Sequence, residues 1–369
     1  MDWIRRELDD LPEYRAGRVG GPVEAVGAGQ ILLASNESPW DPPQAVISAM
    51  EKVLHWLNRY PSRTNEALRE VLADWHGVEV SNVMVGCGGV EIGRLAGNIV
   101  LGRGQKAVFG APSFPDFEIL TRLCGGEPVL VPLRDLTYDL DSVCRAIDHD
   151  TRLAIICNPN NPTGTGVDDV SLRHFLEAVP AHCLVLVDEA YWEYTNGALG
   201  HSAITQVADF PNLVVLRTFS KAFALAGIRV GYGIASGTVI QAMRKVQLPL
   251  SVSLVAEAAA IAAVRQRDVM EQRAAEVRAE RERVRDRLLA LGLRIPVSHG
   301  NFLFIPGTTG LNLVEACAAN DIAIRRIGDL GSRITIGNTE QNNRVLAIAA
   351  STMTEGGGSN IVSGSSACV

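Results

Sequence analysis

The residue of this chain with the clearest chemical potential is Lys221, in the run TFSKAFALAGIRVGY of residues 218–232. A single lysine stands here among small and apolar side chains. Burial of an ammonium group costs on the order of several kcal/mol unless the charge is paired or lost. Taken alone, Lys221 is explained equally by exposure to solvent. If it is buried, a Schiff base between its amine and an aldehyde would remove the isolated charge.

Three other stretches follow apolar runs and carry groups that suit one ligand. The turn GCGGVEIGRL at 86–95 offers backbone N–H groups and a helix N-terminus, which favour a phosphate. NPNNPTG at 158–164 contributes Asn161, and VDEAY at 187–191 contributes Asp188 and Tyr191. Taken alone, the glycine-rich stretch is better explained as a plain turn, and a structural turn would also explain the second stretch. A carboxylate at the end of a buried strand, however, calls for a cationic or protonated partner.

One cofactor accounts for all of these groups. It needs a phosphate for the glycine-rich turn, a ring cation for Asp188, a phenolate for hydrogen-bond donors and an aldehyde for Lys221. Pyridoxal 5'-phosphate (PLP) has all four features. The sequence therefore predicts PLP as the cofactor.

The elements that must position these residues form an alternating pattern. Short apolar runs rich in Val and Ile, which we interpret as strands, alternate with helical patterns at 82–88, 106–112, 128–133, 153–159, 184–190, 213–219 and 230–235. Several runs lack polar alternation, which is typical of strands covered on both faces. This predicts an α/β fold with a mostly parallel sheet and helices on both faces, whose functional residues lie beyond the carboxyl ends of the strands.

The pattern changes after residue 255. Residues 256–293 are rich in helix formers of mixed charge and predict a long solvated helical region that joins two domains. Strand-like stretches at 293–306 and 322–337 indicate a smaller α+β domain. We expect an N-terminal arm that is part of the small domain at 1–42, a large PLP-binding domain at 43–260, the interdomain helix and small domain at 261–352, and a disordered Gly/Ser-rich tail at 353–369.

Composition excludes several classes of protein. The chain is 47% hydrophobic and carries a formal net charge of −7, which disfavours nucleic acid as a partner. Its seven cysteines are scattered without a CxxC pair, so we expect reduced thiols and no metal site. The N-terminus lacks a hydrophobic signal region and no uncharged apolar run reaches ~20 residues, so we expect a cytoplasmic protein that does not enter membranes.

A set of motifs occurs in the order of a known family: LLASNESPWDPP, NRYPSRTNEALRE, NPNNPTG, VDEAY, TFSKAFALAGIRVGY and RITIGNTEQNN. Through them the chain resembles fold-type I PLP-dependent aminotransferases of the histidinol-phosphate aminotransferase family. VGCGGVE, VPLRDLTYDLD and VVLRTFSKA resemble its aromatic (phenylalanine-type) subgroup. The resemblance covers nearly the whole chain except the tail.

The resemblance implies roles for the cofactor-binding residues. Asp188 would keep the pyridine nitrogen protonated, and Asn161 and Tyr191 would hydrogen-bond the ring oxygen. Lys221, once displaced by substrate, would act as general base and acid. Contacts with the phosphate or the ring face are implied for Ser220, Arg229, the backbone of Cys87, Gly88 and Gly89, and Phe114, where the family commonly has tyrosine.

The resemblance also implies partners and substrates. Tyr60 would reach the cofactor phosphate of a second subunit in a homodimer with a shared active site. Arg333 would bind the substrate α-carboxylate, Arg325 a distal acidic group, and Tyr14 would lie over the substrate. We favour ping-pong transfer of an amino group between an aromatic amino acid and 2-oxoglutarate. Alternatives are a histidinol-phosphate aminotransferase of histidine biosynthesis and, more distantly, a PLP-dependent amino acid decarboxylase.

Overall fold

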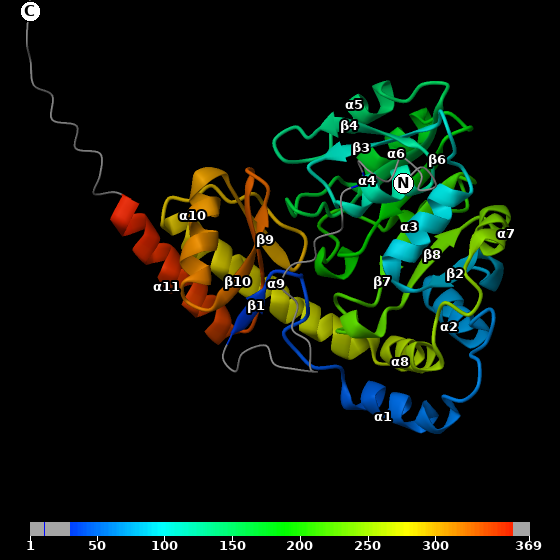
Figure 1. Cartoon of the computed structure of the whole chain (residues 1–369), viewed down its shortest axis with the longest axis horizontal. Coiled ribbons are helices and arrows are strands. Elements are labelled where there is room, and N and C mark those ends of the chain that lie inside the picture. Colours follow the sequence, from blue (N-terminus) through cyan, green and yellow to red (C-terminus); the bar gives the residue numbers. More distant parts are fainter. Residues whose placement is uncertain (1–10, 12–29, 357–369) are drawn as a thin grey trace, which may run out of the picture. The chain divides into compact units, whose positions relative to one another are not determined.

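The architecture comes from a computed structural model that describes Leu11 and residues 30–356 (Figure 1). The strands are β1 Ile31–Leu33, β2 Val83–Gly86, β3 Lys106–Ala111, β4 Glu127–Pro132, β5 Thr151–Cys157, β6 Leu184–Asp188, β7 Leu213–Thr218, β8 Gly231–Ala235, β9 Phe302–Pro306, β10 Ile322–Ile327 and β11 Gly331–Thr335. The α-helices are α1 Gln44–Val53, α2 Glu66–His76, α3 Gly88–Asn98, α4 Asp116–Leu123, α5 Leu140–Arg145, α6 Asp169–Ala178, α7 Gly237–Val246, α8 Leu254–Arg265, α9 Arg267–Ala290, α10 Gly307–Ala318 and α11 Thr339–Gly356.

The chain divides into two compact units. The larger contains Glu37–Arg278 and Pro296–Asn301, and the smaller contains Ala279–Ile295 together with residues 30–36 and 302–356. Helix α9 thus contributes residues to both units. No helix in the described part of the chain is both long and apolar enough to cross a membrane.

A seven-stranded sheet forms the centre of the larger unit, in the order β2-β8-β7-β6-β5-β3-β4. Strands β7, β6, β5, β3 and β4 run parallel to one another, whereas β8 is antiparallel to both β2 and β7. The central strands β5, β6 and β7 are almost wholly buried, as expected for apolar runs covered on both faces. The predicted α/β class with a mostly parallel sheet is confirmed.

The edge strand β4 carries two prolines. The N–H groups of Glu127 and Leu133, on either side of the proline positions, donate to Gln105 and Ala111 on the β3 side. Because N–H groups alternate in direction along a strand, those of residues 128, 130 and 132 would point away from β3. Pro128 and Pro132 have no N–H, so only Leu130 can offer a donor at this edge.

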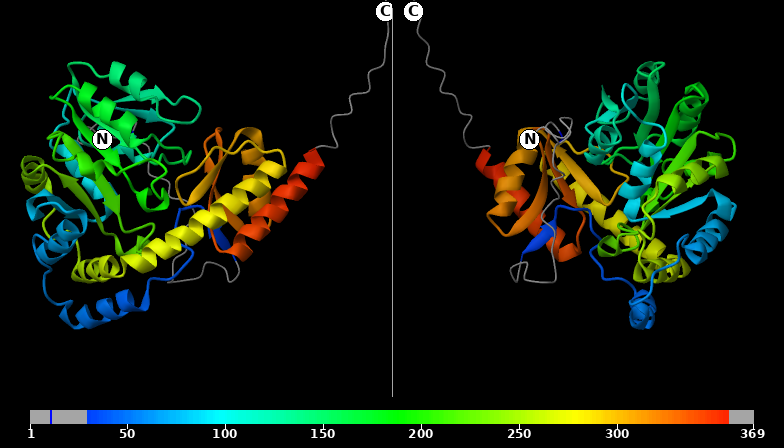
Figure 2. Two further views of the ribbon diagram at one scale, coloured as in Figure 1. Left: turned by 180° about the vertical axis from the view of Figure 1, so that it is seen from behind. Right: turned by 45° about the vertical axis from the view of Figure 1, so that its right-hand side comes forward.

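The smaller unit is built on a four-stranded sheet in the order β1-β10-β11-β9. Strands β10, β11 and β9 are antiparallel, while β1 pairs in parallel with β10. The second part of α9 and helix α11 lie side by side, as the left view of Figure 2 shows, and Asn342 Nδ2 donates to Glu280 Oε1 at 3.0 Å between them.

The long helical region after residue 255 is divided into two helices of different character. Helix α8 begins at the cap residue Ser253, whose side chain accepts the N–H of Ala256 at 3.1 Å, and ends before Gln266. It is rich in buried alanine and packs against α1 and α2, so the expectation of a solvated helix is wrong for this segment. Only α9 has the expected character, with one buried stripe that includes Met270, Ala274 and Val277.

Candidate active site

Three neighbouring parallel strands bring the loops of the predicted catalytic residues to one edge of the large sheet. Cys157 at the end of β5 lies opposite Asp188 at the end of β6, and Asp188 lies opposite Leu216 in β7. The loops that leave these strands carry Asn161, Tyr191 and Lys221. The carboxyl ends of parallel strands thus place the polar residues together, as expected for this class of sheet.

Asp188 lies on the face of the sheet that α3 covers. A Cβ atom on Gly93 of α3 would lie 3.8 Å from Leu186 and 3.9 Å from Leu216, so these two leucines point toward α3. Side chains alternate along a strand, and residues at i and i+2 share a face. Asp188 therefore shares the face of Leu186, and Glu189 points the other way.

The carboxyl group of Asp188 is buried, with 6% of the residue exposed. One of its oxygens accepts the N–H of Ala190 at 3.0 Å. Burial raises the pKa of Asp188 to about 7, against the opposing effects of the Ala190 hydrogen bond and the charge of Lys221. The negative charge at this position is therefore costly without a cation at the carboxylate oxygens.

Lys221 lies in a tight loop after β7 between the buried residues Ser220 and Ala222. Lys221 itself is half-buried, so its predicted burial is only partly met. Its Nζ lies 5.9 Å from the centre of the Tyr191 ring. The Lys221 carbonyl accepts the N–H of Ala224 at 3.1 Å, which closes the turn that presents the amine.

The predicted phosphate turn is assembled around Gly88, the first residue of α3. Gly88 has a φ of +76°, and a Cβ atom there would lie 2.4 Å from Arg229 Nη2, so only glycine fits. Arg229 Nη1 in turn donates to Ser220 Oγ at 3.2 Å. On the other side, a Cβ atom on Gly231 would lie 2.7 Å from the Gly89 backbone nitrogen. The predicted residues Gly88, Gly89, Ser220 and Arg229 are therefore neighbours.

The predicted role of the Cys87 backbone needs a change. The Cys87 N–H donates to the Glu91 carboxylate, one turn further along α3, which also accepts Ser251 Oγ at 2.9 Å. Gly88 and Gly89, as the first residues of the helix, have no intrahelical acceptor for their N–H groups. These two N–H groups are therefore better placed than that of Cys87 to bind a phosphate. The sequence analysis missed Glu91 and Ser251, although a glutamate four residues into a helix is a known partner for the N-terminus.

A buried polar network links the loops of Phe114 and Asn161. The Tyr138 hydroxyl donates to Ser113 Oγ at 3.0 Å, and Ser113 Oγ donates to Asn160 Oδ1 at 2.8 Å. Ser113 and Asn160 are the chain neighbours of Phe114 and Asn161, so the network fixes both loops. Sequence reasoning missed it because its members are 25 and 47 positions apart.

The remaining predicted residues are not placed in this group. Tyr60 is 87% exposed, and Tyr14 lies outside the described residues. Arg325 and Arg333 belong to the smaller unit, where they are register partners on β10 and β11 and so share one face of that sheet. Arg333 is 8% exposed, and its Nη2 donates to the Ala34 carbonyl at 2.6 Å.

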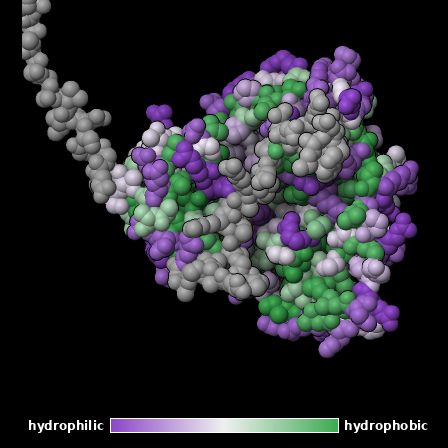
Figure 3. Space-filling view, in the orientation of Figure 1, coloured by the Kyte–Doolittle hydropathy of each residue, from purple (hydrophilic) through white to green (hydrophobic). Residues whose placement is uncertain are grey.

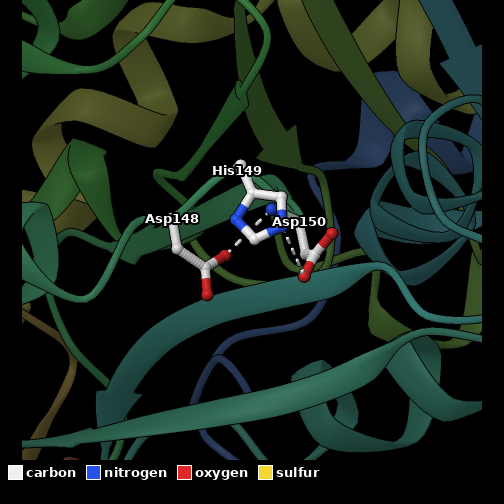
Figure 4. A group of neighbouring side chains, drawn as sticks. All are labelled: Asp148, His149 and Asp150. Carbon is white, nitrogen blue, oxygen red and sulfur yellow. Dashed lines mark hydrogen bonds and ion pairs between the residues drawn. The ribbon is translucent and has the colours of Figure 1, made fainter.

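One cluster in the described residues has the composition of a metal site: Asp148, His149 and Asp150, which Figure 4 shows in the turn before β5. Its carboxylates already have partners. Asp148 accepts Lys106 Nζ at 2.6 Å and the N–H groups of Asp150 and Thr151 at 3.0 Å each. The cluster is explained as a turn with an ion pair, and we assign no metal to it.

Comparison with known proteins identifies the family. The model of aminotransferase class I and II matches residues 28–349, and the chain belongs to this family. It is 41% identical over 350 residues to an aromatic amino acid aminotransferase of Rhodococcus jostii (strain RHA1), covering 94% of this chain and 95% of the relative. An aromatic amino acid aminotransferase of Mycobacterium sp. (strain KMS) is 39% identical over 354 residues, covering 94% of this chain and 97% of the relative.

Solved structures agree with this assignment. A histidinol-phosphate aminotransferase from Sinorhizobium meliloti in complex with pyridoxal-5'-phosphate superposes with a TM-score of 0.86 at 25% identity, covering 96% of this chain and 98% of that one. The protein is thus an aminotransferase of fold type I, and the resemblance found in its motifs is confirmed.

Proposed function

We propose that this aminotransferase binds PLP in its larger unit and transfers an amino group between an aromatic amino acid and 2-oxoglutarate. The observation that carries the proposal is the buried Asp188 carboxylate beside Lys221, on the same unit as the Gly88–Arg229–Ser220 cradle. The names of the relatives at about 40% identity support the aromatic substrate. They favour it over histidinol phosphate, which gives its name to a relative of known structure at the lower identity of 25%.

The residues present fit PLP. A Cβ atom on Gly88 would collide with the Arg229 guanidinium, and one on Gly231 would collide with the backbone of Gly88 and Gly89. The two glycines therefore let the guanidinium and the backbone N–H groups come close together, as a phosphate site requires. Asp188 needs a cation at its oxygens, and a protonated pyridine nitrogen supplies one. When bound, PLP supplies an aldehyde for amines and a ring that accepts electrons from the substrate Cα.

Each of the predicted residues would then have a separate role toward PLP. Gly88, Gly89, Ser220 and Arg229 bind the phosphate, and Phe114 packs on the ring. Asp188 holds a proton on the ring nitrogen, because its anion is stabilised by the cation formed there. Asn161 and Tyr191 donate hydrogen bonds to the ring oxygen. The Lys221 amine would hold the aldehyde group of the cofactor, and during the reaction it would take up and return the proton at the substrate Cα.

Substrate recognition would use the smaller unit. Arg325 and Arg333 extend from one face of the β10–β11 pair. A guanidinium binds a carboxylate through two parallel hydrogen bonds, so Arg333 suits the α-carboxylate and Arg325 the distal carboxylate of 2-oxoglutarate. A contact from Tyr14 stays a prediction.

The test is a set of amino donors with 2-oxoglutarate as acceptor: phenylalanine, tyrosine and histidinol phosphate. We expect phenylalanine and tyrosine to give the higher kcat/KM. A clear preference for histidinol phosphate would refute the substrate assignment, and release of carbon dioxide without need for an oxo acid would refute transamination. Lys221→Ala should abolish turnover and the attachment of PLP that borohydride reduction makes permanent, and retention of both would refute the role of Lys221.

We also propose a homodimer. The segment after α1 exposes Leu54, Trp56 and Leu57 at 48%, 62% and 59%, next to Tyr60. Figure 3 shows apolar residues gathered at the lower edge of the molecule, where α1 lies in Figure 1. An exposed apolar cluster of this kind is typical of a protein interface. Such an interface would place Tyr60 against a second copy, as the motif NRYPS implies.

Sedimentation tests the dimer. We expect Trp56→Glu to sediment as a monomer, because a buried charge at the interface is costly. Val170→Glu is the matched control, since Val170 is 60% exposed on a different helix, α6. A wild-type protein that sediments as an active monomer would contradict the proposal.

The free thiols of the six cysteines in the described residues support the expected cytoplasmic location.

A further inference from the structure

A buried charged cluster lies behind the catalytic edge of the large sheet. We call it the back-face cluster: Glu189, Glu193, Ser202 and Arg217. Arg217 Nε donates to Glu189 Oε2 at 2.8 Å, and Arg217 Nη1 donates to Glu193 Oε1 at 2.9 Å. The side chains of Arg217, Glu189 and Glu193 are 5%, 0% and 6% exposed. The proposed chemistry uses none of these residues.

The cluster faces away from the cofactor side. Asp188 shares its face of the sheet with Leu186 and Leu216, so Glu189 and Arg217, each one residue further along, point to the opposite face. The aromatic and imidazole groups there belong to other elements: Trp192 lies 5.7 Å from the Arg217 guanidinium, and Tyr232 on β8 is the register partner of Arg217. The Tyr232 hydroxyl contacts His76 Nε2 of α2 at 2.9 Å.

The covalent positions of Glu189 and Arg217 connect the cluster to the active site. Glu189 follows Asp188 directly, and Arg217 is four residues before Lys221. Their ion pair therefore ties the start of the loop that carries Asp188 and Tyr191 to the strand that ends in the lysine loop. The Glu189 N–H also donates to the Leu216 carbonyl at 2.9 Å, which extends the β6–β7 pairing by one residue.

Glu189 has a second attachment that Glu193 lacks. Its Oε1 accepts the Ala203 N–H at 2.8 Å, and its Oε2 accepts Ser202 Oγ at 2.6 Å. Ser202 Oγ in turn accepts Arg217 Nη2 at 3.0 Å. Glu189 therefore joins three segments, namely the end of β6, strand β7 and the 3-10 helix Ala203–Gln206. Glu193, in the 3-10 helix Trp192–Tyr194, contacts the cluster through Arg217.

We propose that Glu189, held by Arg217 and Ser202, is a positioning residue that fixes Asp188 at the cofactor ring nitrogen and in register with Lys221. The inference rests on the proposed function, because it assumes that Asp188 and Lys221 act on PLP. Loss of the Glu189 attachments lets the end of β6 shift relative to β7. The ring nitrogen then loses its partner, although every cofactor-binding side chain remains.

The chain offers a matched pair of variants. Glu189→Gln and Glu193→Gln each remove one of two carboxylates and leave Arg217 with one anionic partner, so the cluster keeps the same net charge in both. The two variants differ in the segments whose contacts they remove. A purely stabilising cluster predicts a loss of stability in both variants, larger for Glu189→Gln because of its additional hydrogen bonds, and an unchanged bound cofactor. A positioning role predicts that only Glu189→Gln changes the bound cofactor.

The experiment compares purified holoenzymes by three measurements: urea unfolding, the pH titration of the visible absorbance of bound PLP, and kcat and KM for phenylalanine. We expect both variants to lose stability. Only Glu189→Gln should move the absorbance midpoint and lower kcat by about tenfold or more, with KM little changed. Equal absorbance midpoints and equal kcat in the two variants would overturn the proposal, as would a wild-type absorbance in Glu189→Gln.

Two additions keep the test decisive. If Glu189→Gln does not fold, Ser202→Ala removes the hydroxyl that contacts both Glu189 and Arg217 and leaves their direct ion pair in place. The same shift in the absorbance midpoint is then expected at smaller size. A wild-type absorbance in that variant would then overturn the proposal. Wild type and Lys221→Ala are measured in parallel. Failure of wild type to attach PLP at Lys221 would refute the proposed function itself, whereas a normal wild type with a normal Glu189→Gln refutes only the positioning role.

Discussion

The raised pKa of Asp188 leads to a signed prediction about the stability of the cofactor-free protein. The group titrates at about 7 in the folded protein, mainly because of burial, and at about 3.8 in an unfolded chain. Between these values the folded protein holds a proton that the unfolded chain has released, so stability falls as pH rises from about 4 to about 7. The difference of about 3 units corresponds to about 4 kcal/mol, at about 1.4 kcal/mol per unit.

Asp188→Asn removes this dependence because the amide does not titrate. We expect the free energy of unfolding of wild type, relative to Asp188→Asn, to decline by up to about 4 kcal/mol between pH 4 and pH 8. The measurement is urea unfolding of cofactor-free protein across this range, following the transition that involves the larger unit. Parallel curves for the two proteins would refute the assignment of a raised pKa to Asp188.

Addition of PLP extends the same prediction. A protonated ring nitrogen favours the anion of Asp188, so bound PLP should abolish the excess pH dependence of wild type. Asp188→Asn should bind PLP more weakly than wild type. An analogue in which carbon replaces the ring nitrogen should bind both proteins alike. The ratio of the affinities of wild type and Asp188→Asn is the quantity to compare for PLP and for the analogue. An equal ratio for both ligands would contradict a contact between Asp188 and the ring nitrogen.

Two further predictions concern the cradle and the loops around the ring. Gly88→Ala places a Cβ atom 2.4 Å from Arg229 Nη2, so the affinity for PLP, measured by fluorescence titration, should fall by about tenfold or more. Gly77→Ala is the control, because Gly77 also has a positive φ, +65°, but its Cβ atom would have no neighbour within 4 Å. This control should lower stability without changing the affinity for PLP. Equal PLP affinity in the two variants would contradict this role of Gly88. Ser113→Ala removes the hydrogen bonds that Ser113 makes with Tyr138 and Asn160, and it should lower the free energy of unfolding by about 1–3 kcal/mol. Tyr138→Phe removes only the first of these two bonds, so its loss should be smaller. A larger loss in Tyr138→Phe would show that Ser113 is not the centre of that network.

The sequence allowed much of the large sheet to be predicted, because apolar runs between turn residues mark buried strands. The runs at 128–133 and 184–190 correspond to β4 Glu127–Pro132 and β6 Leu184–Asp188. Strand direction was less accessible. Nothing in the composition of 230–235 shows that β8 runs antiparallel to both neighbours, since direction depends on the connections between strands. Strand β1, only three residues long, was too short for its pattern to be recognised.

The candidate site was predictable where its residues follow strands, and less so where contacts join distant segments. Asp188 and Lys221 could be selected because a charged residue beside an apolar run is unusual. The partner of Arg217 could not be selected, because Glu189 lies 28 positions away and is adjacent only through strand pairing. The resemblance implies a phosphate contact for the Cys87 N–H, and the pattern of glycines does not show that the Glu91 side chain returns to the same group.

The two prolines of β4 have a consequence for how copies of this protein can associate. A strand added along that edge would find one outward N–H, at Leu130, where three are needed for a regular ladder. Continuous growth of the sheet from molecule to molecule is therefore blocked on this side. Self-association at this end of the sheet would have to use side chains, whose shape and charge select a particular mate, instead of main-chain bonds that any extended peptide could supply.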